Sequence, residues 1–396
     1  MSFFTDVSTE MIYPLLPVFL ASVLGANASF IGAIEGVAET TASLLKLLSG
    51  WWSDKVGSRK LLVVVGYGIA SVVRPFTAAT RTASQVLAIR LTDRIGKGIR
   101  SSARDALLAD SAPVSARGRA FGFHAAADNA GAVVGPLLAF MFLKLQGVGS
   151  FEGTRRLMPH DEQALRNVFW LSAVPALVAM IVLVIVVRDV PRHAAEAKKD
   201  AGTIDQISGG LTKRFWAYIV VVLLFTLGNS TDAFLLLRAN QLGVPVAMAP
   251  ILWALLNFVK SATGTYGGGL SDRVGRKPLI VAGWLLYSAV YFAFGWATAA
   301  WHAWILFAIY GIFYGLTEGT EKALVTDIVP AQRRGSAFGW YNLAIGLGAL
   351  PASLIFGRIW DTSGAPTAFV FGATLALIAA LLMAFVAPAL NRPAAK

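Results

Sequence analysis

The chain has 396 residues, of which 56% are hydrophobic and 14% are charged, and it contains no cysteine. An ordinary soluble chain is about 25% charged, so this sequence lacks the polar surface that a soluble protein of its size needs. The composition also excludes a collagen, a disordered chain and a disulfide-stapled secreted domain. Without cysteine there is no thiolate metal site and no thiol nucleophile. The net charge is +12, but no basic arm or block of like charges concentrates it, so we expect no nucleic-acid partner.

Hydrophobic windows are the strongest structural signal in the chain. A bilayer core of about 30 Å requires roughly 20 apolar residues for each helical crossing. Windows of this length predict an all-α integral membrane protein of the cell (inner or plasma) membrane. The twelve predicted membrane-spanning helices lie at residues 3–25, 29–52, 61–80, 84–111, 119–145, 165–187, 215–241, 246–269, 278–299, 302–328, 336–359 and 366–389.

The distribution of lysine and arginine predicts the orientation of these helices. With the N-terminus inside, the inner loops hold 18 of these residues and the outer loops hold 6. Cytoplasmic loops of membrane proteins carry such an excess. We therefore expect both termini to be cytoplasmic.

The sequence also repeats itself, because several short segments recur in the same order at nearly constant spacing. The matching pairs are 8–10 with 230–232, 53–57 with 271–275, Asp110 with Asp327, and 118–122 with 335–339. Parallel repeats of six helices are typical of one transporter architecture. They predict two pseudo-symmetric six-helix bundles at 1–187 and 215–396, joined by a cytoplasmic linker at 188–214.

Two loops at the repeat spacing carry the same motif. Residues 50–60 read Gly-Trp-Trp-Ser-Asp-Lys-Val-Gly-Ser-Arg-Lys, and residues 268–277 read Gly-Gly-Leu-Ser-Asp-Arg-Val-Gly-Arg-Lys. Glycine permits a tight turn, and aspartate can cap a helix or pair with arginine. Both loops resemble the signature loop of the major facilitator superfamily. The resemblance covers the whole chain and implies that fold, alternating access, and gating roles for Gly50, Asp54, Gly57, Arg59, Asp272, Gly275 and Arg276.

Two further patterns resemble this family. Residues 94–98 read Arg-Ile-Gly-Lys-Gly and resemble its Arg-x-x-Gln-Gly pattern, with Lys97 in place of glutamine. The window 119–145 has small residues and a proline at the spacing of the motif of its drug/proton antiporters, at Gly131, Gly135 and Pro136. The usual final glycine pair is absent from this window. Small residues allow close helix approach and proline allows a bend. The resemblance favours export by antiport.

Several charges fall inside the predicted spans, where each centrally placed charge costs about 2.5–3.5 kcal/mol on insertion scales. The helix at 84–111 carries seven of them on one face. That face lines a wet cavity, or its charges pair within their own half and stabilise the fold. We expect a pathway for substrate and protons through Glu10, Glu39, Asp93, Arg94, Lys97, His124, Asp128, Asp232, Glu318 and Glu321.

Within this set the residues have different expected roles. Glu10 and its repeat counterpart Asp232 are the expected proton carriers, because shielding from water favours a protonated carboxyl group. His124 and Asp128 lie four residues apart on one helical face, so they can also relay a proton. Lys97, with Arg94, is expected to meet an anionic or zwitterionic group of the substrate.

No metal site or cofactor is predicted, since the four histidines lie on different predicted elements. A cation path lined by carboxylates at Glu10, Glu35, Glu39 and Asp232 stays open as an alternative. The chain also lacks Gly-x-Ser-x-Gly, His-Glu-x-x-His and phosphate-loop motifs, so we expect no enzyme.

These observations predict a secondary active transporter. We expect a monomeric, proton-coupled exporter of a small organic substrate, anionic or zwitterionic in character, that works in the lipid bilayer by alternating access. The alternative is an importer or exporter of a siderophore, an organic anion or a divalent metal ion.

Overall fold

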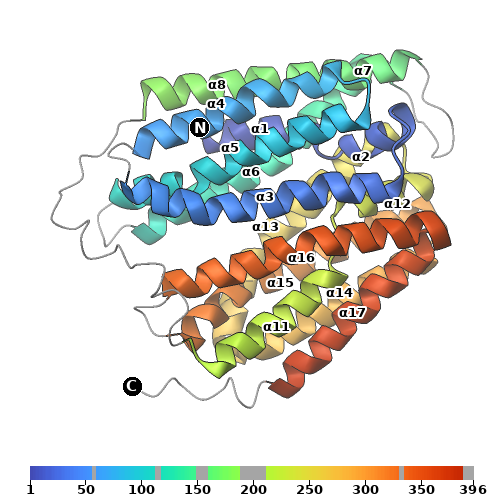
Figure 1. Ribbon diagram of the computed structural model, residues 1–396. Helices are drawn as coiled ribbons and strands as arrows, with labels where there is room; N and C mark the ends of the chain where they lie inside the picture. Colours follow the sequence, from blue (N-terminus) through green and yellow to red (C-terminus); the bar gives the residue numbers. More distant parts are fainter. Residues whose placement is uncertain (56–58, 112–116, 149–158, 188–210, 330–333, 387–396) are drawn as a thin grey trace. The chain divides into compact units, whose positions relative to one another are not determined.

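The computed structural model describes residues 1–55, 59–111, 117–148, 159–187, 211–329 and 334–386, and every regular element in these ranges is a helix (Figure 1). The first part of the chain forms α1 (Ser2–Ile12), α2 (Leu16–Val18), η1 (Phe19–Val23), α3 (Ala28–Lys55), α4 (Arg59–Val73), η2 (Arg74–Ala79), α5 (Ala83–Asp110), α6 (Arg117–Leu145), α7 (Pro159–Leu171) and α8 (Ala173–Ile185). The second part forms α11 (Lys213–Gly228), α12 (Ala233–Gln241), η4 (Val246–Met248), α13 (Ala249–Val274), α14 (Arg276–Trp296), α15 (Ala300–Ile328), α16 (Arg334–Ser363) and α17 (Ala365–Val386).

Some predicted windows contain two or three consecutive helical pieces, and we call the pieces of one window together a rod. Counted in this way, the described helices follow the twelve predicted windows in order. Nine helical stretches within the described ranges are long and apolar enough to cross a membrane. The first rod, α3 and α5 do not meet this criterion, for local reasons. Prolines at 14 and 17 interrupt the first rod, and charged residues lower the hydropathy of α3 and α5.

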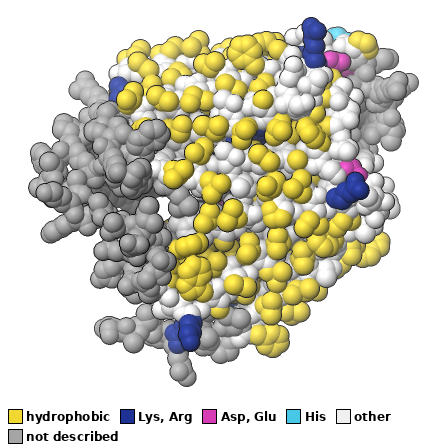
Figure 2. Space-filling view, viewed as in Figure 1, with side chains coloured by type: hydrophobic (Ala, Val, Ile, Leu, Met, Phe, Trp, Pro, Cys, Tyr) yellow, Lys and Arg dark blue, Asp and Glu magenta, His cyan; other side chains and the backbone are white. Residues whose placement is uncertain are grey.

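Hydrophobic side chains cover the outer surface of several helices. On α8 the exposed residues Val174, Leu177, Ile181 and Val184 follow helical spacing and form one stripe. Figure 2 shows one face of the molecule over which hydrophobic side chains are spread widely among other atoms, with few charged side chains in view. A soluble protein does not expose an apolar surface of this kind, whereas lipid tails accept it.

The chain divides into two compact units. Unit 1 contains Met1–Ala26, Val37–Ala201 and Gly243–Ala254, and unit 2 contains Asn27–Gly36, Gly202–Leu242 and Leu255–Lys396. Each unit thus includes a short segment from the other half of the sequence. Most of the predicted linker at 188–214 lies outside the described residues, and the predicted bundles at 1–187 and 215–396 stay a prediction.

One of these short segments is the start of α3, which packs in unit 2 against α16. The Asp361 carboxylate accepts hydrogen bonds from the backbone amides of Ala28 (2.9 Å) and Ser29 (2.8 Å) and from the Ser29 hydroxyl. An added Cβ at Gly357 would lie 2.6 Å from the Ala28 carbonyl oxygen, so the two helices are in close contact. The carboxylate satisfies amides that the first turn of a helix leaves without a partner.

The sequence repeat reappears in the packing within each unit. In unit 1, a Cβ at Gly66 would lie 2.7 Å from the Arg100 Cβ, where α4 crosses α5. In unit 2, a Cβ at Gly283 would collide with the Thr317 side chain, where α14 crosses α15. Both members of the second pair lie 217 residues after their counterparts, which is the repeat spacing found in the sequence.

Candidate functional site

In unit 2, Asp232 lies where the seventh rod is interrupted. The helix α11 ends at Gly228 and α12 begins at Ala233. The Asp232 carboxylate accepts hydrogen bonds from the hydroxyls of Tyr310 (2.7 Å) and Tyr314 (3.0 Å), both on α15. Within the described residues no ion pair reaches Asp232, although Lys260 and Glu35 are charged groups near it. Broken helices at membrane depth are typical of binding sites in transporters.

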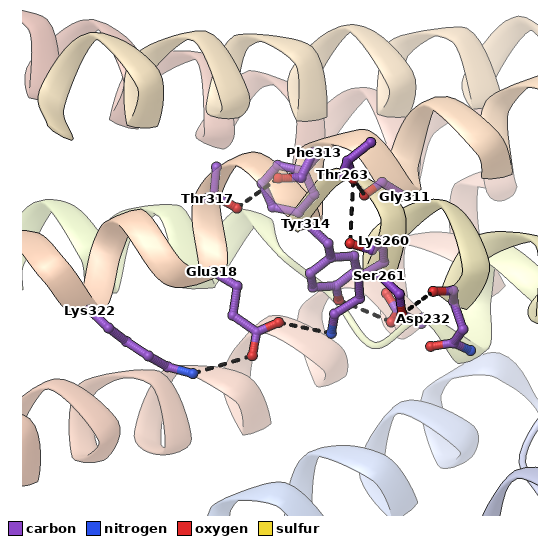
Figure 3. A network of polar contacts seen from close by, with 11 residues as sticks. Asp232, Lys260, Ser261, Thr263, Gly311, Phe313, Tyr314, Thr317, Glu318 and Lys322 are labelled. Atoms are coloured by element: carbon purple, nitrogen blue, oxygen red, sulfur yellow. Dashed lines mark hydrogen bonds and ion pairs between the residues drawn. The ribbon is translucent and has the colours of Figure 1, made fainter. Parts of the chain in front are cut away.

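Next to Asp232 lies an ion-pair chain that joins α13 to α15 (Figure 3). Lys260 Nζ lies 2.9 Å from Glu318 Oε2, and Lys322 Nζ lies 3.2 Å from Glu318 Oε1. The same Lys260 Nζ lies 4.6 Å from the centre of the Tyr314 ring, a cation–π geometry. The three charged side chains are 30 to 51% exposed. Charged side chains inside membrane proteins rarely face lipid and mostly mark the interior of the helix bundle.

Glu321 is also on α15 but has other hydrogen-bond partners. Its two carboxylate oxygens accept hydrogen bonds from Trp284 Nε1 (2.8 Å) and from the Tyr341 hydroxyl (2.6 Å). The structure therefore places Glu321 among aromatic donors, apart from the chain formed by Lys260, Glu318 and Lys322.

In unit 1, Glu10 near the end of α1 has a similar environment to Asp232. Its Oε2 accepts a hydrogen bond from Trp253 Nε1 (2.7 Å). The Trp253 ring in turn lies 4.9 Å from the Tyr13 ring, in the interruption that follows α1. The two carboxyl groups that correspond in the repeat thus both accept hydrogen bonds from aromatic side chains, and Asp232 lies directly before α12 while Glu10 lies in the last turn of α1.

The cations of α5 surround Glu10 and Glu39. Arg94 and Lys97 act electrostatically on both carboxylates. The Arg94 Nε atom is buried without a hydrogen-bond partner among the described groups. This leaves a donor in unit 1 that no described side chain satisfies.

Asp93 has a closed, structural environment. Its Oδ1 lies 2.7 Å from Arg74 Nη2, and the two side chains are 4% and 6% exposed. Arg74 also donates to the Ser8 hydroxyl (3.2 Å) on α1. The predicted pathway role of Asp93 remains untested, but this buried pair resembles a fold-stabilising contact more than a site that exchanges ligands.

His124 and Asp128 lie together on α6, as their spacing predicts. His124 Nδ1 is 3.3 Å from Asp128 Oδ2, and the Ser2 hydroxyl donates to Asp128 Oδ1. The other ring nitrogen of His124 is buried and has no hydrogen-bond partner among the described groups. The geometry allows a proton relay, and that role remains a prediction.

The small residues of α6 face α1. A Cβ at Gly131 would lie 2.6 Å from the Phe3 carbonyl oxygen, and one at Gly135 would lie 2.6 Å from the Val7 carbonyl oxygen and 3.1 Å from the Glu10 Cβ. Pro136 follows inside the same helix. These glycines therefore allow the backbone of α6 to approach the helix that carries Glu10.

The structure describes the two motif loops only in part. In the second loop, Gly275 has φ +99°, which favours glycine. Arg276 Nε lies 3.3 Å from Asp327 Oδ2 on α15, and its Nη1 donates to the Ser271 hydroxyl. Gly57 and the side chains of Asp54 and Asp272 lie outside the described parts of the chain. Gly50 belongs to α3, Arg59 begins α4, and their gating roles remain predictions.

Several residues of these sites were not predicted from the sequence. Lys260, Tyr310 and Tyr314 contact Asp232 or Glu318, Trp253 contacts Glu10, and Arg74 contacts Asp93. The available signals were a lone lysine within the apolar window 246–269 and polar side chains at every fourth position of α15, from Tyr310 to Lys322.

Comparison with known sequences identifies the family. The profile of the Major Facilitator Superfamily matches residues 1–259 and 237–396, which together span the chain. An uncharacterised MFS-type transporter of Methanocaldococcus jannaschii is 32% identical over 391 residues, covering 97% of this chain and 92% of the relative. A shorter similarity links the chain to Multidrug resistance protein MdtH of Escherichia coli, with 30% identity over 116 residues and 29% of each chain covered.

Solved structures show the same fold. The crystal structure of a mutant of the nucleoside transporter NupG matches with a TM-score of 0.77 and 14% identity, covering 97% of both chains. That of a D-xylose–proton symporter matches with a TM-score of 0.74 and 17% identity, covering 96% of this chain and 95% of the symporter. The predicted fold class is therefore confirmed: the protein is a multi-pass membrane transporter and not an enzyme. By sequence profile and by fold, the chain belongs to the major facilitator superfamily.

Proposed function

We propose that this transporter is a proton-coupled exporter of a small organic substrate, with Asp232 as a proton carrier. The observation that carries the proposal is the environment of Asp232. Its carboxylate lies at a helix break within a membrane-spanning rod and accepts hydrogen bonds from two tyrosine hydroxyls. It has no ion-pair partner among the described residues, so a bound proton can satisfy its charge without breaking a salt bridge.

Glu10 is the proposed second carrier. Among the described residues, the hydrogen bond to its carboxylate comes from Trp253, a neutral donor. A neutral donor fixes the position of a carboxylate but does not neutralise its negative charge. A proton or a cationic group of the substrate can then neutralise that charge. The correspondence of Glu10 and Asp232 in the repeat gives each half of the sequence one such group.

Two observations support export over uptake. The antiporter-like spacing of Gly131, Gly135 and Pro136 falls where α6 packs on the helix that carries Glu10. In addition, part of the chain is similar to a multidrug resistance protein. We propose that the exporter acts as a monomer in the cell membrane, with both termini in the cytoplasm, in keeping with the excess of cations in the predicted inner loops.

Arg94 and Lys97 support an anionic or zwitterionic substrate, because both are cations near Glu10 and Glu39 and the Arg94 Nε atom is buried without a hydrogen-bond partner among the described groups. The same observation supports the second candidate function, transport of an organic anion in the opposite direction. The direction of proton movement separates the two candidates.

The test uses proteoliposomes that contain the full chain, a lumenal pH dye and a panel of small organic solutes that includes ethidium. We expect an imposed pH gradient to drive accumulation of at least one solute, with protons moving in the opposite direction. Asp232→Asn should abolish gradient-driven accumulation but permit exchange at equal concentrations on both sides. Movement of proton and solute in the same direction would replace antiport by symport, and unchanged gradient-driven transport by Asp232→Asn would exclude Asp232 as the carrier.

A further inference from the structure

Lys260 is a charged side chain to which the proposed proton pathway assigns no role. It lies within the membrane-spanning stretch Val246–Ser271, where a charge is costly and therefore functional or closely paired. Its side chain remains 30% exposed. The lysine is held in place by close packing of α13 on α15, since a Cβ at Gly311 would lie 2.9 Å from the Leu256 carbonyl oxygen.

Glu318, the ion-pair partner of Lys260, has a second cationic partner and can therefore give up its contact with Lys260. Glu318 bonds Lys260 through one oxygen and Lys322 through the other. If an anionic group takes the place of Glu318 at Lys260, Glu318 keeps its pair with Lys322. The three side chains also carry two positive charges and one negative charge, so the group retains a surplus positive charge. This arrangement favours the arrival of an anion at Lys260.

A second, opposite charge contacts the hydroxyl group of the same tyrosine. Tyr314 presents its ring to Lys260 Nζ at 4.6 Å and donates its hydroxyl to Asp232 at 3.0 Å. Figure 3 shows Lys260, Tyr314 and Asp232 together, with Glu318 on the far side of Lys260. Without its proton, Asp232 is an acceptor for an ammonium group, and the rings of Tyr310 and Tyr314 add faces that attract cations.

We propose that unit 2 binds a zwitterion across Tyr314, with the ammonium group at Asp232 and the carboxylate or other anionic group at Lys260. The proposal rests on the function proposed above and names its substrate class. A proton on Asp232 then competes with the ammonium group, which is the requirement for antiport. A simple amine fills only the Asp232 end, and a simple acid fills only the Lys260 end. The charged groups near Asp232 from the packed helices are Lys260 of α13 and Glu35 of α3.

The test measures ligand binding to the purified full chain by thermal shift and by calorimetry. The probes are ω-amino acids from 3-aminopropionate to 8-aminooctanoate, each compared with the alkylamine and the alkanoate of the same chain length. We expect at least one amino acid to bind more tightly than both of its singly charged analogues. Lys260→Gln should weaken that binding about tenfold, the loss of one charge-assisted hydrogen bond, and Lys260→Arg should retain most of it.

Lys322→Gln is the matched control, because it removes the other lysine on Glu318 and leaves Lys260 in place. The proposal is overturned if no amino acid exceeds its analogues, or if Lys322→Gln weakens binding as much as Lys260→Gln. The failure of proton coupling gives a different result. In that case Lys260→Gln still weakens the binding of the zwitterion. The affinity of the wild type for the zwitterion, however, does not change with pH.

Discussion

Arg74 and Asp93 show how single residues make a charged helix compatible with the membrane interior. Each side chain is more than nine-tenths buried, and the 2.7 Å pair is reinforced by the Ser8 hydroxyl. The pair balances two of the charges near α5, so the remaining cations at Arg94 and Lys97 stand out as candidates for ligand binding. The same helix therefore combines residues that hold the fold with residues available for function.

This division of roles predicts different effects of substitution. Asp93→Leu should destabilise the protein by about 3–5 kcal/mol, because it leaves the buried Arg74 charge without its partner. The double variant Arg74→Leu with Asp93→Leu should recover most of the loss, as measured by thermal denaturation in detergent. Lys97→Gln serves as the comparison and should change the melting temperature little. Equal destabilisation by Lys97→Gln would mean that Lys97 is also a structural partner.

At the scale of elements, the interruptions of two rods and the glycines of α6 determine where the carboxyl groups lie. Asp232 occurs at a break and Glu10 in the last helical turn before one, and at such breaks backbone groups and side chains can face a ligand. The Tyr287 hydroxyl donates to the Gly228 carbonyl (3.1 Å), so the end of α11 is satisfied without a continuous helix. The α6 glycines then set how closely α1 can pack.

The glycine contacts lead to a prediction for α6. Gly135→Ala should lower stability by about 1–3 kcal/mol and reduce transport, because the new methyl group would force α1 away from α6. Gly264→Ala on α13 is the matched control. Its added methyl group meets nothing within 4 Å, and alanine favours a helix over glycine by about 1 kcal/mol. If both variants melt at the wild-type temperature, the approach of α6 to α1 is not limited by Gly135.

At the scale of the whole molecule, the motif loops are the proposed gating elements. The second loop is tied to α15 by the contact between Arg276 and Asp327. Because both side chains lie at the end of the transmembrane rods and away from Asp232 and Lys260 in sequence, we expect them to affect conformational change and not ligand contact.

Accordingly, Asp327→Asn should lower the transport rate several-fold while leaving the affinity for substrate within a few-fold of wild type. Transport assays in proteoliposomes and equilibrium binding in detergent measure the two quantities separately. Loss of equilibrium binding in a variant that remains folded would contradict the gating role.

The sequence predicted the helices better than the contacts between them, for a physical reason. Hydropathy over 20 residues reports transfer into lipid, so windows such as 278–299 closely match α14. Asp232 could be chosen from the sequence as a candidate proton carrier, because it corresponds to Glu10 in the repeat, and that role stays a prediction. The partners Tyr310, Tyr314 and Lys260 come from other rods, and which rods pack together is a tertiary property. For the same reason the sequence does not show that Arg74 pairs with Asp93, and the pathway role of Asp93 stays a prediction.

The bond between Asp361 and the start of α3 has a consequence for how the chain is made. The two partners are 333 residues apart, and at a synthesis rate of about 5–20 residues per second the ribosome needs roughly 20 to 70 s to cover that distance. During this interval the amides of Ala28 and Ser29 need other hydrogen-bond partners, such as water or lipid headgroups. The first turn of α3 thus reaches its final form only near the end of translation, and insertion of the early helices precedes their last contacts.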